Sequence, residues 1–172
     1  MSESAVADTG PILHLTKIGQ ESLFSIFGKI FISEQIKAEL EEYNIFGNIS
    51  VIMDNNLVVE IVNRQEIDEE KKILSRFKIH QSDLSVAVLA RRILPEIVLI
   101  DELELRKGLE TQGYTVIGSL GILFRAFKHG RLTKSELRIS IDQLFNDDTI
   151  YLSKSLRNHV YRMLDELIAE TL

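Results

Sequence analysis

Apolar positions along the chain fall into short continuous runs separated by longer stretches with helical spacing. Continuous runs of this length are typical of strands covered on both faces, whereas helical spacing is typical of amphipathic helices. The runs predict strands over residues 5–8, 29–32, 57–62, 97–100 and 114–117. Because helices separate these strands, the pattern indicates an α/β fold with a parallel sheet and right-handed crossovers.

The helices between the strands are predicted from their spacing and from residues that favour helix ends. Ser33 is placed to cap a helix over residues 34–43, and Thr133-Lys134-Ser135-Glu136 matches a capping box. Ser153 can cap the last helix. Further helices are expected through residues 12–15, over 65–77 with its Glu and Lys residues in water, from Ser82 or Asp83 to before Pro95, over 102–112 and over 122–128. Residues 44–56 show no clear period, so no element is predicted there.

No internal repeat, low-complexity tract or linker interrupts the sequence, and 172 residues suit one α/β domain. We therefore predict a single domain over residues 1–172, in which 131–172 form a C-terminal helical extension. The sequence leaves open whether the two amphipathic helices of this extension complete the core, cover a site or form a dimer contact.

The absence of cysteine narrows the chemistry that the chain can perform. It excludes disulfides, thiolate catalysis and cysteine-ligated zinc or iron–sulfur sites, and it suits a reducing cytoplasm. No apolar run approaches the roughly 18 residues that span a bilayer, and no basic region precedes the first apolar stretch. We therefore expect a cytoplasmic protein without membrane contact, in which any metal is held by oxygen or imidazole.

The overall charge is negative, with a net charge of −6 and an isoelectric point near 5.3. Such a balance argues against non-specific binding to nucleic acid, which depends on Lys and Arg neutralising phosphates. It does not exclude a local basic rim around an acidic, metal-loaded centre.

Four carboxylates stand where the predicted fold brings them together. Asp8 and Asp101 end two apolar strands. Glu39 lies on a predicted helix, and Asp83 opens another. Acids just past strand ends face the crevice in which open α/β sheets bind ligands. Since Mg²⁺ and Mn²⁺ prefer oxygen ligands and clustered carboxylates repel one another without a cation, the acids suggest a divalent-metal site that orients or ionises a water for attack on a phosphodiester.

Other interpretations use the same residues. Acids at strand ends and helix starts often only cap helices, and Asp83 and Glu102 are both placed to do so. A haloacid-dehalogenase type phosphatase needs a second Asp where Gly10 follows Asp8-Thr9, and a response-regulator receiver needs an acid pair at this strand end. The chain also lacks a Gly-x-Gly-x-x-Gly fingerprint and a Walker loop, so dinucleotide and P-loop interpretations do not apply.

Two features near the acids stay open from the sequence alone. Gly118 and Gly121 suit a tight turn into a helix better than a phosphate cradle. His14 follows the Asp8 loop, so it either approaches the site or is an ordinary surface or packed histidine.

Five short segments follow one another in a recognisable order. They are VADTGPIL at 6–13, ISEQIKAEL at 32–40, SDLSVAVLA at 82–90, LIDELELRK at 99–107 and VIGSLGIL at 116–123. Each is weak alone, but the ordered set is fairly specific and spans residues 5 to about 130. In this order and spacing the segments resemble the PIN-domain nuclease family, particularly its branch of uncharacterised PIN-like nucleic-acid-binding proteins.

The resemblance implies a three-layer α/β/α sandwich with a short central parallel sheet. It also implies an Mg²⁺- or Mn²⁺-dependent ribonuclease, often the toxin of a toxin–antitoxin pair and often a homodimer. The positions that match the four family acids are Asp8, Glu39, Asp83 and Asp101. Glu102 stands where this branch commonly has a second Asp, and Ser119 stands where a Ser or Thr often helps to complete the site.

Two departures from the family pattern affect the acids. The third acid is commonly Glu after Gly, whereas here Asp83 follows Ser82, and Glu102 replaces Asp with a longer side chain. Neither change removes an oxygen ligand, although both alter the spacing around an ion. Arg106 lies about one helical turn beyond Glu102, so it can pair with that acid, as helix-surface residues often do, or face a substrate phosphate.

These observations lead to one hypothesis and one rival. The hypothesis is a metal-dependent, PIN-like endoribonuclease in which the four acids and Glu102 bind Mg²⁺ or Mn²⁺, and a basic rim holds single-stranded RNA. Its partners would be RNA, an antitoxin protein and a second copy of the chain. The rival is a PIN fold kept as a binding or regulatory module, which the acidic isoelectric point and the two altered acids favour. Candidates for the rim, which solvated helix faces explain equally well, are Arg91, Arg92, Arg125, Lys128, His129 and Arg131.

Overall fold

Five strands form one sheet in the computed structural model, which describes residues 3–147 and 153–169. The strand order is β3-β2-β1-β4-β5, and every neighbouring pair is parallel. Helices flank this sheet, which confirms the predicted α/β fold with a short central parallel sheet. The strands are β1 (Ser4–Ala7), β2 (Lys29–Ser33), β3 (Leu57–Glu60), β4 (Ile97–Leu99) and β5 (Val116–Ile117).

The strands β1 and β4, which are neighbours near the middle of the sheet, are buried on both faces. The side chains of residues 5–7 and 97–99 are at most 2% exposed. The register aligns Ala7 with Leu99, and the Asp8 N–H donates to the Leu99 carbonyl at 3.0 Å. A strand covered on both faces requires a continuous apolar run, which explains why the clearest runs in the sequence form this part of the sheet.

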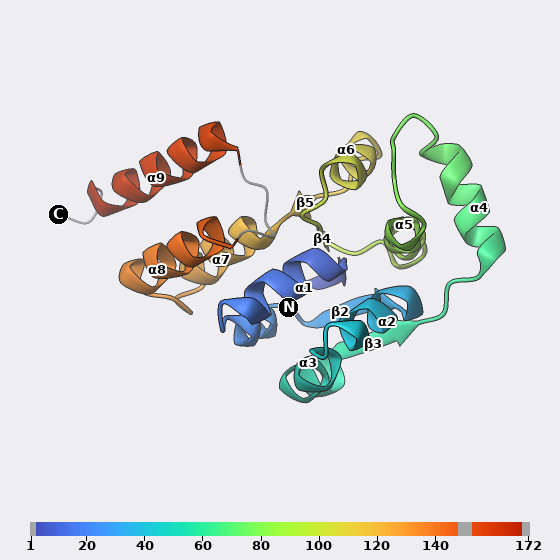
Figure 1. The fold of residues 1–172 in the computed structure, drawn as a ribbon, viewed down its shortest axis with the longest axis horizontal. Helices are drawn as coiled ribbons and strands as arrows, with labels where there is room; N and C mark the ends of the chain where they lie inside the picture. Colours follow the sequence, from blue (N-terminus) through green and yellow to red (C-terminus); the bar gives the residue numbers. More distant parts are fainter. Residues whose placement is uncertain (1–2, 148–152, 170–172) are drawn as a thin grey trace. The chain divides into compact units, whose positions relative to one another are not determined.

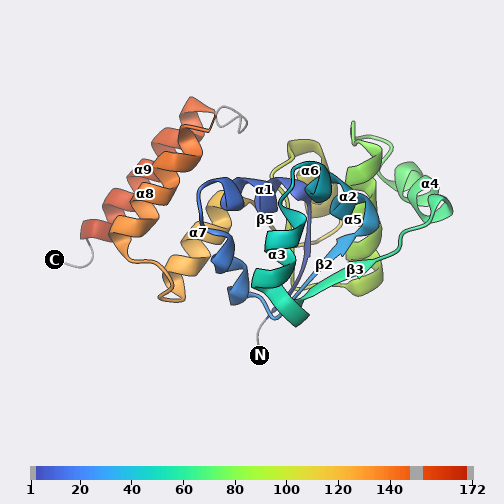
Figure 2. The ribbon, with the colours of Figure 1, turned by 60° about the horizontal axis from the view of Figure 1, so that its bottom comes forward.

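The chain divides into two compact units, of which the first ends at Ile122 and the second begins at Leu123. The first unit holds the sheet, with α1, α2 and α3 on one side of it and α4, α5 and α6 on the other (Figure 1). Figure 2 shows β2 and β3 side by side, as their pairing requires. The helices of this unit are α1 (Thr9–Lys17), α2 (Glu34–Glu42), α3 (Phe46–Met53), α4 (Arg64–Ile73), α5 (Gln81–Ile93) and α6 (Leu103–Thr111), with 3₁₀ turns η1 (Glu21–Ile26) and η2 (Asp54–Asn56).

The helix ends follow the signals in the sequence. Ser33 caps α2 by accepting a hydrogen bond from the Ile36 N–H at 3.1 Å. Thr133 forms the predicted capping box at the start of α8 (Lys134–Phe145). The helix α5 ends at Ile93 and is followed by Leu94, whose φ of 52° lies in the left-handed region, directly before Pro95. Short polar side chains at helix starts satisfy backbone N–H groups that have no partner within the helix.

One local expectation was wrong, and one segment for which no element was predicted contains helices. Residues 44–56, for which no element was predicted, contain α3 and η2, because Ile49 and Met53 bury one face of a helix despite the Gly and Asn residues around them. The charged helix α4 was expected to keep its Glu and Lys residues in water, but Glu70 is only 2% exposed. Glu70 shares a helix face with Ile67 and Leu74, which are also buried, and it pairs with Arg91 of α5.

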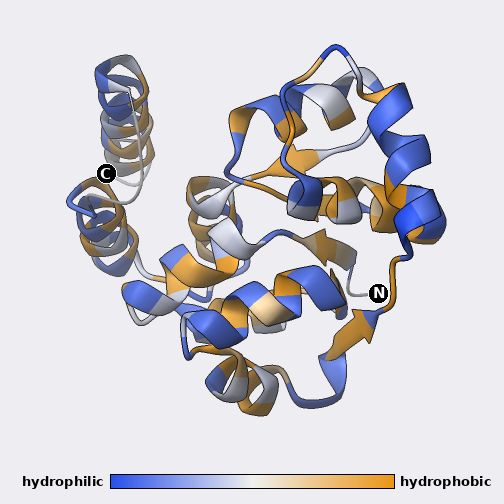
Figure 3. Cartoon of the chain, turned by 45° about the vertical axis from the view of Figure 1, so that its right-hand side comes forward, coloured by the Kyte–Doolittle hydropathy of each residue, from blue (hydrophilic) through white to orange (hydrophobic). Residues whose placement is uncertain are grey.

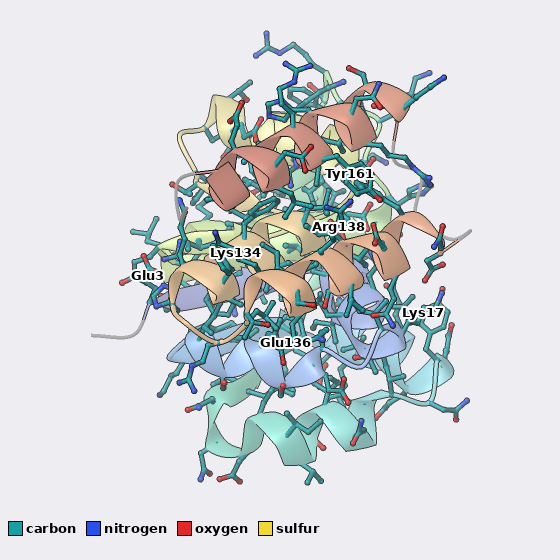
Figure 4. All side chains as sticks on the ribbon, turned by 90° about the vertical axis from the view of Figure 1, so that its left-hand side faces the viewer. Glu3, Lys17, Lys134, Glu136, Arg138 and Tyr161 are labelled. Atoms are coloured by element: carbon teal, nitrogen blue, oxygen red, sulfur yellow. The ribbon has the colours of Figure 1, made fainter. Side chains whose placement is uncertain are left out.

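The second unit contains most of α7 (Ser119–Lys128), together with α8 and α9 (Lys154–Ala169). Buried apolar side chains of α8 and α9 come together between these two helices, among them Leu137 and Leu164. The guanidinium of Arg138 lies over the Tyr161 ring at 5.9 Å, and the Tyr161 hydroxyl donates to Asp142 at 2.5 Å (Figure 4). The helices α8 and α9 therefore pack as an antiparallel pair, with these polar contacts beside their apolar interface.

The prediction of a single domain over residues 1–172, with 131–172 as an extension, stays a prediction, because compactness alone does not define a domain. The second unit begins within α7, earlier than the extension was placed. None of the helices in the part of the chain that the structure describes has both the length and the apolar character needed to cross a membrane.

Candidate active site

Two of the predicted site acids lie where the direction of the chain through the sheet reverses. Asp8 follows β1, and Asp101 follows β4, the neighbouring strand. From β1 the chain moves outward through β2 and β3, then returns to β4 and continues to β5 on the opposite side. This reversal places the ends of β1 and β4 at the crevice where open α/β sheets bind ligands, as the sequence predicted.

Glu39 and Asp83 come to this crevice on α2 and α5. The Thr9 hydroxyl donates to the Glu39 carboxylate at 2.5 Å, which links α2 to the first residue after Asp8. The hydroxyls of Ser33 and Ser85 meet at 2.6 Å, both fully buried, and join the start of α2 to α5. The two helices that carry these acids are therefore held to each other and to β1 by buried or half-buried hydrogen bonds.

Asp8 is the most perturbed acid of the group. Its side chain is 6% exposed and makes no capping hydrogen bond to α1. Burial, followed by repulsion from Asp83, raises its pKa from 3.8 to about 8, and Glu39 and Asp101 add to the rise. The Thr9 backbone N–H opposes the shift. The four acids are thus close enough to act on one another's ionisation.

The pKa of Asp83 is also raised. Burial is the main cause, and repulsion from Glu102 and then Glu39 adds to it. The charge of His80, the residue before the first turn of α5, acts in the opposite direction. The charges of Glu39 and Glu102 therefore both act on Asp83. Through this interaction Glu102 also belongs to the acid cluster.

Asp101 is held by three hydrogen bonds. Its Oδ1 accepts from the Ser119 N–H at 2.8 Å, and its Oδ2 accepts from the Ser119 hydroxyl at 2.5 Å and from His14 Nδ1–H at 2.7 Å. Burial alone would raise the pKa of Asp101, but the bonds from His14 and Ser119 outweigh it and lower the pKa. Asp101 is therefore kept ionised in a fixed orientation, and Ser119 lies in the site, as the resemblance implied.

His14 is the residue of this site that the sequence left undecided. It lies on the buried face of α1 beside Ile12 and Leu15, and it is 8% exposed. Its spacing from Asp8 allowed a contact with the site, but the partner, Asp101, is 87 positions away. Periodicity indicates which face of a helix is buried and not which strand end that face meets.

Glu102 acts as the cap of α6. Its carboxylate accepts from the backbone N–H of Glu104 at 3.0 Å and of Leu105 at 2.5 Å. Arg106 donates to the Ile100 carbonyl at 2.9 Å and lies 3.9 Å from Glu110, so it does not pair with Glu102, which was one of its two possible roles. The capping interpretation, left open by the sequence, therefore describes Glu102, whose oxygens are already engaged.

Gly118 and Gly10 let the chain approach Asp101 closely. A Cβ on Gly118 would lie 2.4 Å from Asp101 Oδ1 and 2.9 Å from Arg106 Nη2. A Cβ on Gly10 would lie 3.3 Å from the Asp101 Cβ. Gly118 is thus needed because a side chain there would collide with Asp101. Its turn packs against this acid and does not form a phosphate-binding loop.

The arginines considered as RNA contacts in the first unit are paired with acids. Arg91 forms an ion pair with buried Glu70. Arg92 pairs with Glu66 at 2.5 Å and with Glu60 at 3.5 Å. These pairs hold α4, α5 and β3 together. The role of Arg125, Lys128, His129 and Arg131, which lie in the second unit, stays a prediction.

Comparison with known families agrees with the parallel sheet flanked by helices. The profile of a PIN domain family, DUF3368, matches residues 4–166. The chain belongs to the PIN domain family. The resemblance inferred from the five segments is thereby confirmed, and the parallel sheet flanked by helices is consistent with the PIN fold. PIN domains are typically metal-dependent nucleases. No curated protein matches the chain.

The acids of this PIN domain have the chemistry that a divalent ion requires. Carboxylate oxygens are the preferred ligands of Mg²⁺ and Mn²⁺, and the repulsion that raises the pKa of Asp8 would be relieved by a cation. Over residues 3–147 and 153–169, no group of three or more His, Asp or Glu side chains is already arranged to hold a metal ion. Ion binding would therefore require side-chain rotation, which three hydrogen bonds oppose at Asp101 and one from Thr9 opposes at Glu39.

Proposed function

We propose that this PIN domain is an endoribonuclease that depends on Mg²⁺ or Mn²⁺ and hydrolyses phosphodiester bonds in single-stranded RNA. The observation that carries the proposal is the burial of Asp8 at the reversal point of the sheet, within reach of the charges of Asp83, Glu39 and Asp101. Such a cluster is costly at neutral pH unless a cation neutralises it. The position and the oxygen-only donor set favour a hard divalent ion.

The side chains divide into those that would hold the ion and those that hold its ligands. Asp8, Glu39 and Asp83 would bind the ion, with Asp101 as the oriented fourth acid. When bound, the ion would supply an activated water and stabilise negative charge on the scissile phosphate. Thr9 fixes the Glu39 carboxylate, while Ser119 and His14 fix that of Asp101. Because Glu102 is already the cap of α6, it would contribute charge and not a ligand.

Cleavage of RNA by purified protein tests the proposal. We expect the full chain with Mn²⁺ to cut a labelled single-stranded RNA, and Asp8→Asn and Asp83→Asn to lower the rate by about 100-fold or more, because each removes a charged ligand. Asp68→Asn, an exposed acid of α4, is the control and should cut at the wild-type rate. Equal cleavage by the wild type and both site variants would indicate a contaminating nuclease and overturn the proposal.

The rival function is a PIN fold that binds or regulates without cutting. Two observations favour it: both oxygens of Asp101 accept hydrogen bonds, and Glu102 is engaged as a cap. Calorimetric titration with Mn²⁺ separates the two functions. The nuclease binds the ion and loses binding in Asp8→Asn, whereas a silent module has no such requirement.

The finer parts of the proposal concern the role of the protein in the cell. We propose that it acts in the cytoplasm as the toxin of a toxin–antitoxin pair, with a small antitoxin protein and a second copy of the chain as partners. The support for this is the family membership together with the resemblance to toxin-like PIN branches.

His14 is expected to act on metal binding through Asp101. We expect His14→Leu to weaken Mn²⁺ binding and to lower kcat by about 10- to 100-fold, because Asp101 loses a donor that orients it. His14→Asn keeps an N–H near the position of Nδ1 and should recover much of that loss. Calorimetry and RNA cleavage measure both effects. If the Leu and Asn variants behave alike, His14 only fills space beside α1.

A further inference from the structure

The end of α4 and the loop that follows it form one of the most basic stretches of this acidic chain. Residues 71–80 contain Lys71, Lys72, Arg76, Lys78 and His80, and no acid occurs between Glu70 and Asp83. Four of the chain's 20 Lys and Arg residues therefore fall within eight positions, although the net charge of the chain is −6. We call residues 71–80 the basic segment.

Apolar side chains of the basic segment fix it to α6. A Cβ on Gly108 would lie 3.0 Å from Leu74 Cδ2, 3.4 Å from Phe77 Cδ2 and 3.6 Å from Ile79 Cδ1. Leu74 is buried, and Phe77 and Ile79 are half-buried. The basic side chains that alternate with these anchors are exposed. The segment thus presents its charges to solvent from a defined position, beside the largely hydrophilic α4 (Figure 3).

The Lys and Arg side chains of the basic segment take part in none of the ion pairs among the described residues of the first unit. Across the described residues, Lys71, Lys72, Arg76 and Lys78 form no ion pair, as the salt bridges there involve other cations. By contrast, Arg91, Arg92 and Lys107 each pair with a glutamate. Exposed cations without acidic partners are the side chains that bind phosphates in nucleic-acid-binding proteins.

The basic segment leads directly into the acidic site. His80 precedes α5, and its carbonyl accepts from the Leu84 N–H at 3.1 Å, so it belongs to the same helix start as Asp83. His80 is also close enough for its charge to oppose the rise in the pKa of Asp83. The basic segment therefore ends next to Asp83, one of the acids that would hold the ion.

We propose that the basic segment contacts the phosphate backbone of the RNA strand that the site cleaves. This inference rests on the proposed nuclease function and names its substrate-holding surface. The contacts are to phosphates and carry no base specificity, since exposed Lys and Arg side chains neutralise charge without reading base edges. They take the place of Arg91 and Arg92, which were candidates for such contacts and pair with acids instead.

A triple variant tests the basic segment. Lys72→Gln/Arg76→Gln/Lys78→Gln removes the three strong cations nearest to His80, and the control Lys29→Gln/Lys154→Gln/Arg162→Gln removes three exposed cations elsewhere. Binding of fluorescent single-stranded RNA is measured by anisotropy in an Asp8→Asn background, which prevents cutting, between about 50 and 200 mM salt. We expect the test variant to bind RNA about tenfold more weakly, and its log-affinity to depend on log salt with a slope smaller by about 2.

The outcomes separate this inference from the proposed function. Unchanged binding in the test variant, or equal losses in test and control variants, overturns the basic segment as an RNA contact. A similar loss for single-stranded DNA supports contact with phosphates, whereas a loss confined to one RNA sequence overturns it. With Asp8 restored, the test variant should keep its Mn²⁺ affinity and its kcat at saturating RNA, while KM rises. Failure of the wild type to cut RNA would refute the nuclease and leave the binding result to stand by itself.

Discussion

The metal-free protein is expected to lose stability as the pH rises from about 4 to about 8, and Asp8→Asn is expected to remove most of that loss. The cause is the proton on Asp8, whose pKa burial and neighbouring acids raise from 3.8 to about 8 in the folded state. Between these two values the unfolded chain releases the proton and the folded protein retains it, so the free energy of unfolding falls with pH. Each pKa unit corresponds to about 1.4 kcal/mol, so the loss amounts to several kcal/mol.

Urea unfolding in EDTA near pH 5 and near pH 8.5 measures this effect. Asn has nearly the shape of Asp but carries no charge, so Asp8→Asn should be more stable than the wild type at the higher pH. Added Mn²⁺ should stabilise the wild type there and leave Asp8→Asn nearly unchanged, because an ion stabilises only the state that binds it. Asp68→Asn, which changes an exposed acid, is the control. Wild-type stability that is flat or rises over this pH range would contradict the prediction.

Gly118→Ala is expected to disable the site by displacing Asp101. The added methyl would stand 2.4 Å from Asp101 Oδ1, 2.9 Å from Arg106 Nη2 and 3.2 Å from the Ile100 carbonyl. Such overpacking costs typically about 1–3 kcal/mol, and misplacing a catalytic group by about 1 Å can cost about 100-fold in rate. We therefore expect a lower melting temperature and a loss of RNA cleavage of that order.

The matched control for this prediction is Gly47→Ala in α3. A Cβ on Gly47 would meet no atom within 4 Å, and the change improves helix propensity by up to about 1 kcal/mol. Thermal unfolding and cleavage rates of the two variants are compared under the same conditions. Wild-type cleavage by Gly118→Ala would mean that Asp101 can move without cost, and that its three hydrogen bonds are not needed for function.

The elements that were predictable from the sequence are those whose pattern depends only on their own residues and near neighbours. The strand 97–100 needed only a continuous apolar run between Pro95 and Asp101, and the caps at Ser33 and Thr133 needed only local side chains. The helix α3 was missed because Gly47 and its polar neighbours interrupt the apolar spacing. Its buried face is defined by packing against η1 and α2, which are other elements of the fold. The burial of Glu70 was missed because it depends on Arg91, which lies on another helix.

The features of the candidate site also divide into those that follow from local sequence and those that depend on how distant segments pack. The ends of β1 and β4 were predictable as neighbours because parallel strands bring their carboxyl ends to one edge of the sheet. The capping role of Glu102 was visible as an alternative because it requires only the next three residues. The contacts of Asp101 with His14 and Ser119 required knowledge of how α1 and the residues after β5 meet the end of β4, which no local pattern contains.

The hydrogen bonds that hold Asp101 also determine when the site can exist during synthesis. His14 and Ser119 are 105 positions apart, and the strand β1 acquires its neighbour β4 only after the whole crossover through α4 and α5 has been made. Pairing between such distant segments is slow, because the loop must close before its contacts can stabilise it. A nascent chain on the ribosome therefore carries its acids apart from one another until most of the first unit has emerged, so the acid cluster forms late in synthesis.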